Sequence, residues 1–360
     1  MKIAVYSSYL DTFGGGERYI ATIAGTLSFD HHVDLLLDKH LTKIGSDYLK
    51  SNLSQRFNLN LDKVNIIVDS PIGKDSSFFS RALFLKKYDF LFYLTDGSIF
   101  YPTAGKNILH IQSPIEGQPA QSVWGKIKLK KWDLIIYNSK FTRNHSLKNW
   151  PLFSKVIYPP VDTESIKPLQ KKKYILSVGR FFGYLKDKKH EILIKAFERL
   201  KQNKKSLGWS LHLAGAAKEG DENYLKELKN RAKDLEVKFY PNLGYEELIK
   251  LFGYSSVYWH AAGFGEQEPT KMEHFGISVA EAMAGGSVPV VVDKGGLTEI
   301  VNDGINGFLW SDLRDFESKT LELLSNKSLW HKMSVEAIKK AGNFSKENFE
   351  ISIRNLIKTI

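Results

Sequence analysis

Two glutamates, Glu273 and Glu281, bracket a Phe-Gly pair in the stretch TKMEHFGISVAEAMAGGSVPVVV, residues 270–292. A carboxylate that precedes a glycine, outside a helix, can accept hydrogen bonds from the hydroxyl groups of a sugar. A helix that begins after a glycine offers backbone N–H groups to an anion. Ser278 and Glu281 also have the Ser-x-x-Glu spacing of a capping box, so a purely structural role for Glu281 stays open.

A second candidate site follows the predicted strand 174–178. Arg180 comes directly after Gly179, and a lysine-rich loop then leads into a helical segment. A guanidinium with one or more ammonium groups at the carboxyl end of a strand is the arrangement that holds a diphosphate. A solvent-exposed basic loop is the alternative, and Arg180 is the better candidate because it follows the strand immediately. The lysines of this loop are Lys186, Lys188 and Lys189.

A run of three glycines, Gly14, Gly15 and Gly16, follows the first predicted strand and precedes an amphipathic helix. Glycines let the backbone approach a ligand closely, and the start of the helix favours an anion. The run lacks the Gly-Lys-Ser/Thr of a phosphate-binding loop, and Tyr19 stands where a dinucleotide fingerprint needs its third glycine. A tight turn is the plain alternative, but the position at a strand end favours a role in ligand binding.

Histidine and serine chemistry gives weaker signals. His110 lies near the end of the predicted strand 107–111, where it could reach a ligand or have a structural role. None of the ten histidines shows a metal-binding spacing such as HExxH, so we expect no metal site built by the protein. The chain also lacks a Gly-x-Ser-x-Gly nucleophile elbow.

The most basic stretch is WGKIKLKKW, residues 124–132, in a chain of net charge +11. Such a patch can attract nucleic acid, anionic lipid or a phosphorylated substrate, or it can be a solvated face. No RNA-binding motif accompanies it, so a non-enzymatic nucleic-acid binder is a distant alternative and we expect no nucleic-acid partner. The lysines of the patch are Lys126, Lys128, Lys130 and Lys131.

Short apolar runs alternate with longer amphipathic segments along the chain, which predicts strands covered by helices on both sides. Two such blocks indicate an α/β protein with two doubly wound parallel sheets, whose ligands bind at the carboxyl ends of the strands, in a cleft between facing domains. The predicted strands are 2–6, 33–37, 64–68, 90–94, 107–111, 133–137, 155–158, 174–178, 209–215, 237–240, 256–260, 288–292 and 307–310.

Domain boundaries follow from a stretch with three prolines and no apolar periodicity, residues 159–173. We expect an N-terminal domain over 1–160, a linker over 161–173 and a C-terminal domain over 174–342. The last segment, 343–360, is a predicted helix that could pack back on the N-terminal domain.

Taken together, these motifs resemble the retaining glycosyltransferases of family 4, which have the two-domain GT-B fold. The resemblance spans nearly the whole chain. It is carried by GGGERY, WDLIIYNSKFTRN, VIYPPVD, VGRF with KDKKHEILIKAF, and EHFGISVAEAMAGG with its Glu-x7-Glu spacing. Each piece alone is a weak match, whereas the ordered set is specific. GGGER and EHFGI are most similar to mannosyltransferases that extend lipid-linked glycans.

The resemblance implies a nucleotide-diphosphate sugar donor bound by the C-terminal domain and a glycan or lipid-linked acceptor bound by the N-terminal one. It implies that Arg180 and Lys188 hold the donor diphosphate, with Lys186 and Lys189 as alternatives to Lys188. Glu273 would contact the transferred sugar, and Glu281 would bind the ribose hydroxyls.

The remaining site residues that the resemblance implies surround the donor. They are Gly15 and Gly16 of the glycine loop, Phe275, Gly276 and Ile277 as backbone donors, and His110 near the sugar. Two features depart from the common family pattern and leave the sugar specificity open: a longer loop after Arg180, and an insertion over 263–271.

We therefore expect a retaining, metal-independent hexosyltransferase without a cofactor, with mannose from GDP-mannose as the first choice of donor. A UDP-sugar transferase of the same family, or another GT-B enzyme such as a phosphorylase or an epimerase, is the alternative. Met1-Lys2 leads straight into a strand, no apolar run is long enough to span a bilayer, and cysteine is absent. These features indicate a cytoplasmic protein, peripheral on the inner face of the membrane if the basic patch meets anionic lipid.

Overall fold

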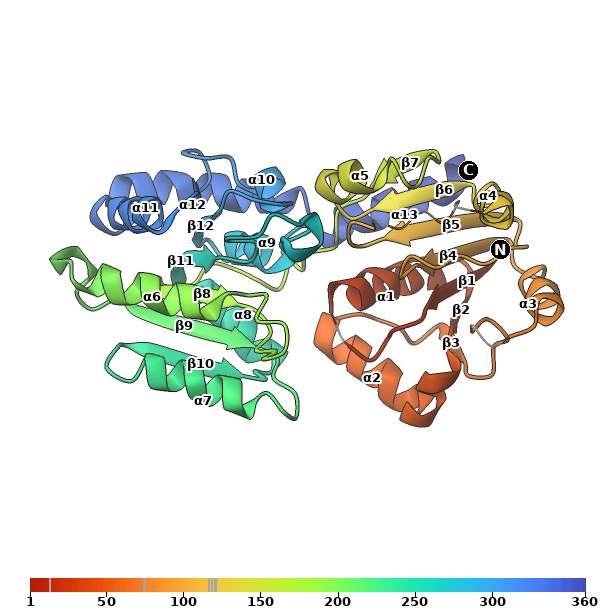
Figure 1. Ribbon diagram of the computed structural model, residues 1–360, viewed down its shortest axis with the longest axis horizontal. Coiled ribbons are helices and arrows are strands. Elements are labelled where there is room, and N and C mark those ends of the chain that lie inside the picture. The colour runs from red at the N-terminus through yellow and green to blue at the C-terminus, as the bar shows by residue number, and fades with distance from the viewer. Residues whose placement is uncertain (13, 74–75, 116, 118, 120–121) are drawn as a thin grey trace. The chain divides into compact units, whose positions relative to one another are not determined.

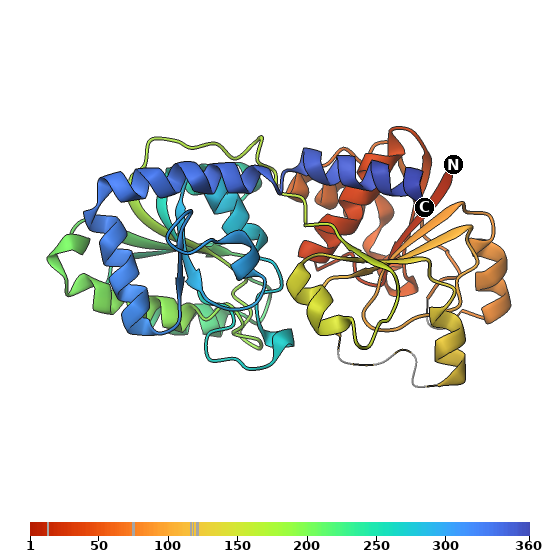
Figure 2. The same cartoon turned by 90° about the horizontal axis from the view of Figure 1, so that it is seen from above.

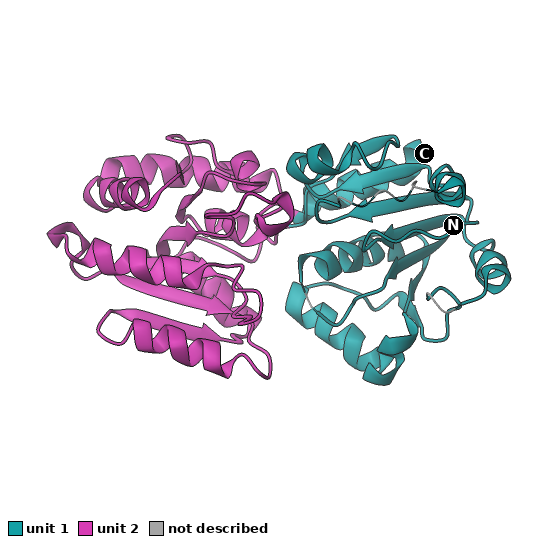
Figure 3. Ribbon diagram, viewed as in Figure 1, with its two compact units in different colours: residues 1–160, 346–360 teal, residues 161–345 magenta. Residues whose placement is uncertain are grey.

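The computed structural model describes residues 1–12, 14–73, 76–115, 117, 119 and 122–360 (Figure 1). The chain forms two compact units (Figure 3). Unit 1 comprises Met1–Pro160 together with Lys346–Ile360, and unit 2 comprises Val161–Ser345. The chain therefore leaves unit 1 after Pro160 and returns to it at Lys346.

Unit 1 contains a seven-stranded sheet in the order β3-β2-β1-β4-β5-β6-β7, and every neighbouring pair is parallel. This order, which grows outward in both directions from β1, is that of a doubly wound sheet. The strands are β1 (Lys2–Ser7), β2 (His32–Leu36), β3 (Val64–Ile67), β4 (Phe90–Leu94), β5 (Lys106–Ile111), β6 (Leu134–Tyr137) and β7 (Ser154–Val156).

Two hydrophobic cores cover the two faces of this sheet. Alternation along β1 separates them, since Ile3 and Val5 enter one core and Ala4 and Tyr6 the other. Both cores consist of residues shielded from water, which explains why the strands are apolar throughout. The helices are α1 (Gly15–Ser28), the 3-10 helix η1 (Lys39–Ile44), α2 (Ser46–Phe57), α3 (Phe78–Leu85), α4 (Val123–Leu129), α5 (Lys140–Ser146) and α13 (Lys346–Thr359).

The C-terminal helix α13 belongs to unit 1, where it packs on α1. Phe349 meets Tyr19 edge-on, with ring centroids 4.8 Å apart, and Ile353 is fully buried in the same core. Arg354 forms an ion pair with Asp30 at the rim. A helix was predicted over residues 343–360, and its buried apolar residues pack against the core of unit 1.

Unit 2 has a six-stranded parallel sheet in the order β10-β9-β8-β11-β12-β13. The strand order reverses between β8 and β11, and in such sheets ligands bind at the carboxyl ends beside this switch point. The strands are β8 (Lys172–Val178), β9 (Ser210–Gly215), β10 (Val237–Pro241), β11 (Ser255–His260), β12 (Val288–Val292) and β13 (Phe308–Trp310).

Helices flank both faces of this second sheet, as the view from above shows (Figure 2). On one face Phe316 stacks on Trp310, with centroids 4.4 Å apart, and contacts Trp259 at 4.6 Å. The helices are α6 (His190–Lys201), α7 (Glu222–Arg231), α8 (Tyr245–Tyr254), α9 (Ile277–Ala284), α10 (Leu297–Ile300), α11 (Leu313–Ser325) and α12 (Lys327–Gly342), with the 3-10 helices η2 (Lys204–Ser206) and η3 (Pro269–Lys271).

Each of the predicted strands is present, with its ends within two residues of the predicted ones, so the fold class of two doubly wound parallel sheets is confirmed. The stretch 161–173, which we expected to be a linker, lies in unit 2. Its apolar residues Val161 and Ile166 are buried, and Asp162 accepts a hydrogen bond from the Tyr245 hydroxyl at 2.5 Å. Because Val161 and Ile166 are buried, the stretch packs as part of unit 2.

Candidate active site

Three segments of unit 2 meet at the carboxyl edge of its sheet. They are the turn after β8, the end of β11 and the start of α9. Two glycines allow close packing at this edge: a Cβ on Gly179 would lie 2.7 Å from Cγ of Lys188 in the same turn, and one on Gly215, at the end of β9, would lie 1.9 Å from the Gly179 carbonyl oxygen. A side chain at either position would displace the turn after β8.

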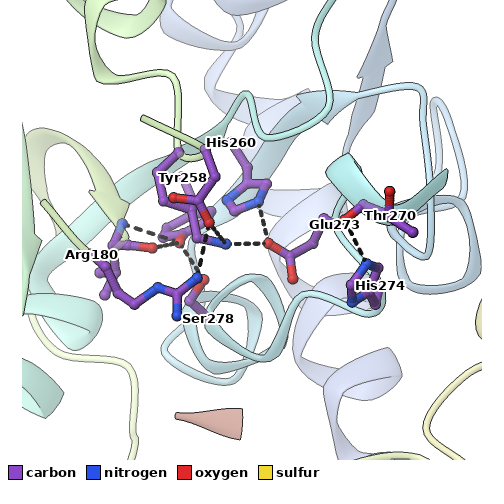
Figure 4. A network of polar contacts seen from close by, with 10 residues as sticks. Arg180, Tyr258, His260, Thr270, Glu273, His274 and Ser278 are labelled. Carbon is purple, nitrogen blue, oxygen red and sulfur yellow. Dashed lines mark hydrogen bonds and ion pairs between the residues drawn. The ribbon is translucent and has the colours of Figure 1, made fainter. Parts of the chain in front are cut away.

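Glu273 is the centre of the cluster (Figure 4). Its Oε2 accepts from Lys188 Nζ at 2.8 Å and lies 3.0 Å from His260 Nε2. Burial raises the pKa of the Glu273 carboxyl, but the Lys188 charge and the hydrogen bonds from His260 and Lys188 outweigh it and hold this pKa well below its usual range. Oε1 has no protein partner among the described residues, so it can accept from a ligand hydroxyl.

Arg180 lies beside this centre and converges with Lys188 on Asp187. Arg180 Nη2 is 3.0 Å from Asp187 Oδ2, and Lys188 Nζ is 3.9 Å from the same oxygen. The Arg180 guanidinium also lies over the Phe182 ring, 5.0 Å from its centroid. Two cations thus lie together beyond the end of β8, where the carboxylate of Asp187 pairs with both of them.

The three candidate lysines of the loop after β8 have different partners in the structure. Lys186 pairs with Glu227 at 3.3 Å and with Glu191 at 3.8 Å. Lys189 pairs with Glu266 at 2.5 Å. Lys188 therefore has the ammonium group that contacts Glu273.

The start of α9 is built on Gly276, which adopts φ +106°. This left-handed conformation favours glycine, and a Cβ here would also lie 2.8 Å from Cδ2 of Leu297. The first N–H groups of a helix have no partner within the helix, so those of Ile277 and Ser278 suit an anion. Phe275 is buried against Phe344, with centroids 5.1 Å apart, so only its backbone can serve the site.

The capping box considered for Ser278 and Glu281 is wrong. The cap position is Gly276, and Ser278 lies inside the helix, where its Oγ accepts from the Tyr258 hydroxyl at 2.8 Å. That hydroxyl also accepts from the Val178 N–H at 3.1 Å. Tyr258 thus ties the end of β8 to the start of α9, and Glu281 is buried one turn further along the helix.

The insertion 263–271 is anchored beside the cluster. In addition to the Lys189 ion pair, Glu266 accepts from Lys294 through its backbone carbonyl at 2.5 Å. The insertion is therefore held by Lys189, just before α6, and by Lys294, in the loop after β12.

The glycine run in unit 1 begins α1, with Gly14 as its cap residue and Gly15 as its first residue. Glu17 reaches back, so that its Oε2 accepts from the Gly14 N–H at 2.8 Å, and Thr12 donates to its other oxygen at 2.6 Å. A Cβ on Gly16 would lie 3.0 Å from Cδ2 of Leu94. A carboxylate thus already caps this helix start.

His110 is 1% exposed and has protein partners at both ring nitrogens. Its Nδ1 lies 3.1 Å from the Ile136 carbonyl oxygen and its Nε2 2.7 Å from the Gln112 side chain, while its ring stacks on Tyr19 at 3.8 Å. Burial lowers the pKa of His110 to about 4, so the ring is neutral. Both ring nitrogens of His110 thus have partners within unit 1.

Sequence reasoning missed three residues of the cluster: Asp187, His260 and Tyr258. His260 is the last residue of a predicted strand in unit 2, the position that drew attention to His110 in unit 1. Asp187 lies between Lys186 and Lys188 in the sequence, so the segment was interpreted as a basic loop and this carboxylate was not considered. Among the described residues, no group of three or more histidine or acidic side chains is placed to hold a metal ion.

Residues 161–340, half of the chain, match the family described as glycosyl transferases group 1. Curated relatives include proteins named GDP-Man:Man(3)GlcNAc(2)-PP-Dol alpha-1,2-mannosyltransferase. That of Dictyostelium discoideum is 28% identical over 63% of this chain and 47% of its own length. That of Homo sapiens is 29% identical over 63% and 49%. The chain thus spans about half the length of these relatives.

Solved structures share the whole fold. A glycosyltransferase from Rickettsia africae superposes with a TM-score of 0.73 at 18% identity, covering 100% of this chain and 99% of that one. An Anabaena protein in complex with UDP gives 0.74 at 19%, covering 100% of both. These likenesses confirm the GT-B fold that the sequence motifs implied.

Proposed function

The chain belongs to the group 1 glycosyl transferases, and from this premise we propose that it transfers mannose from GDP-mannose to a lipid-linked glycan. The names of the curated relatives support this donor and this class of acceptor. The observation that carries the proposal is the convergence of Arg180, Lys188 and Glu273 beside the start of α9.

Transfer breaks the bond between the anomeric carbon and the diphosphate oxygen. Negative charge then grows on the leaving diphosphate, where Arg180, Lys188 and the N–H groups at the start of α9 would stabilise it. Each such contact contributes on the order of 2–4 kcal/mol to lowering the barrier. Asp187 and Glu273 hold the two cations near each other before a donor binds.

Glu273 is suited to the sugar, because positive charge grows on the sugar ring as the bond breaks. Its low pKa keeps the carboxylate ionised, and Oε1 can accept a sugar hydroxyl. We assign retention of anomeric configuration: the acceptor oxygen attacks from the face that the diphosphate leaves, and the leaving phosphate oxygen takes the acceptor's proton. No side chain is then assigned as a general base.

The two cations at the end of β8 also support a metal-independent, cofactor-free reaction. They carry the charge that would neutralise a diphosphate. The acceptor would place the reaction at a membrane surface, for which we propose the inner face, since a chain without cysteine suits a reducing compartment. No helix in the described part of the chain is long and apolar enough to span a bilayer.

Arg180→Ala is expected to lower kcat/KM for sugar transfer at least about tenfold, because it removes one of the two cations on the diphosphate. Arg199→Ala is the matched control. Arg199 lies on α6, its side chain is about as exposed as that of Arg180, and it pairs with Glu317 at 3.1 Å. Initial rates and the thermal midpoint are measured for both variants. Wild-type activity in Arg180→Ala would overturn the diphosphate assignment.

Thermal shift with GDP- and UDP-sugars tests the donor. A donor at a hundred times its Kd adds about 2.7 kcal/mol of stability, so GDP-mannose should raise the midpoint of the wild type. A larger shift with a UDP-sugar would replace GDP-mannose by that donor. If sugar moves to an acceptor without release of nucleotide, the function assigned to the chain changes from a transferase to a phosphorylase or an epimerase.

A further inference from the structure

Helix α3 of unit 1 presents apolar side chains to water. Phe79 is 81% exposed and Leu83, one turn later, is 76% exposed. Residues four apart lie on the same face of a helix, so the two side chains form one apolar ridge. An exposed ridge of large apolar side chains marks an interaction surface more often than a solvated one.

Helix α4 presents a similar face. Val123 is exposed, Trp124 is 72% exposed and Ile127 completes the face one turn later. Trp132, the second tryptophan of the basic stretch, is instead buried in the core and stabilises the fold. Trp124 is therefore the tryptophan of this stretch that a partner can reach.

Tyr101 joins the two helices into one surface. Phe78 of α3 meets the Tyr101 ring edge-on at 5.8 Å, and Lys131, just after α4, places its Nζ 5.7 Å from the same ring. The two helices lead into β4 and β6, at the edge of the sheet where the strands begin (Figure 1). We name this surface the α3–α4 face; its apolar members are Phe79, Leu83, Tyr101, Val123, Trp124 and Ile127.

The charge of the α3–α4 face has a single sign. Segments 77–88 and 122–132 contain no acidic residue. Elsewhere lysines pair with carboxylates, as Lys201 does with Glu236 at 2.8 Å. The exposed lysines of this face have no carboxylate partner among the described residues; they are Lys86, Lys126, Lys130 and Lys131.

We propose that the α3–α4 face docks on an anionic lipid bilayer. The aromatic and aliphatic side chains enter the interface between headgroups and acyl chains, and the lysines pair with lipid phosphates around them. Lysine stems run along apolar surface while their ammonium groups stay in water, which suits this border. A protein partner would need carboxylates matched to each lysine, whereas an anionic bilayer supplies a uniform field. The proposal stands on this surface alone and does not need the transferase activity.

Vesicle flotation tests the proposal. The full chain is expected to float with phosphatidylcholine vesicles that contain roughly 30% phosphatidylglycerol, and much less with phosphatidylcholine alone. Higher salt should weaken the binding through screening. Two triple variants, Phe79→Ser/Leu83→Ser/Trp124→Ser and Lys126→Glu/Lys130→Glu/Lys131→Glu, should each lower the bound fraction at least about tenfold.

Matched controls come from unit 2, which has exposed residues of the same types. Leu207→Ser/Ile305→Ser/Val335→Ser controls the apolar variant, and Lys204→Glu/Lys205→Glu/Lys233→Glu controls the charge variant. Both controls should bind vesicles like the wild type. Because the α3–α4 face lies in unit 1, the thermal shift with a nucleotide sugar should stay at its wild-type size in all variants. That readout separates failure of docking from failure of the proposed donor site.

Three outcomes would overturn the proposal. The first would be failure of the wild type to float with anionic vesicles at low salt. The second would be flotation of the triple variants of the α3–α4 face at the level of their controls. The third is a change of oligomeric state in the apolar variant without a change in flotation, which would assign the face to contact with a second copy of the chain.

Discussion

Lys188→Ala is expected to lower kcat/KM for sugar transfer by about a hundredfold or more while the protein stays folded. One donor to the developing charge is worth on the order of 2–4 kcal/mol. In the proposed reaction Lys188 would serve the diphosphate, and it also holds Glu273 at 2.8 Å. Its removal therefore affects both ends of the breaking bond. Initial rates with GDP-mannose and a glycan acceptor measure the loss.

Lys186→Ala is the matched control, two residues away in the same loop. Lys186 pairs with Glu227 and Glu191 on the surface and does not contact Glu273. Its removal should change kcat/KM by less than about twofold, as expected for exposed ion pairs. A larger loss in Lys186→Ala than in Lys188→Ala would move the diphosphate assignment to Lys186.

The Lys188→Ala variant should also become sensitive to acid. In the wild type, burial raises the pKa of Glu273, but the Lys188 charge and the hydrogen bonds from His260 and Lys188 outweigh this effect. The carboxylate therefore stays ionised at pH values below the ordinary glutamate pKa of about 4.3. Without Lys188, burial raises this pKa. Activity of the variant should then fall with decreasing pH while Glu273 in the wild type is still ionised. Parallel profiles would show that transfer does not need the charge of Glu273.

Much of the fold could be predicted from the sequence, because buried parallel strands leave a strong local signal. Runs such as 90–94 and 288–292 are apolar on both faces and stand at strand positions in the structure. Strand order within each sheet follows from alternation of strands and helices. The N-terminal domain was considered as the partner of α13, but the residues that this helix contacts were not predictable, because Phe349 meets Tyr19 across more than three hundred residues of chain.

The cluster could be predicted only in part. Arg180 was found because it follows a strand directly, and Glu273 because it precedes a glycine at a helix start. The sequence could not choose among the lysines, since side-chain direction in a loop depends on partners that lie far away in the chain. Asp187 and His260 were missed for the same reason: their roles exist only through contacts with Arg180 and Glu273.

Two glycines that sequence reasoning did not consider, Gly295 and Gly296, set the position of Glu273. The Gly296 N–H donates to the Glu273 carbonyl oxygen at 2.8 Å, so the loop after β12 lies directly against the backbone of the site. A Cβ on Gly296 would lie 2.1 Å from the His274 carbonyl oxygen and 2.8 Å from Cα of Phe275. The glycine is needed for space, because its φ of −70° is open to any residue.

Gly296→Ala is therefore expected to displace the Glu273 segment and lower kcat/KM by about a hundredfold, since misplacement of catalytic groups by about 1 Å has effects of this size. Overpacking should also lower the free energy of unfolding by about 1–3 kcal/mol. Gly342→Ala is the control with the same added methyl group, because a Cβ there meets nothing within 4 Å. It should leave rate and urea midpoint near wild type. If Gly296→Ala keeps wild-type kcat/KM, close packing of this loop does not position the carboxylate, and the Lys188 and His260 contacts alone must hold it.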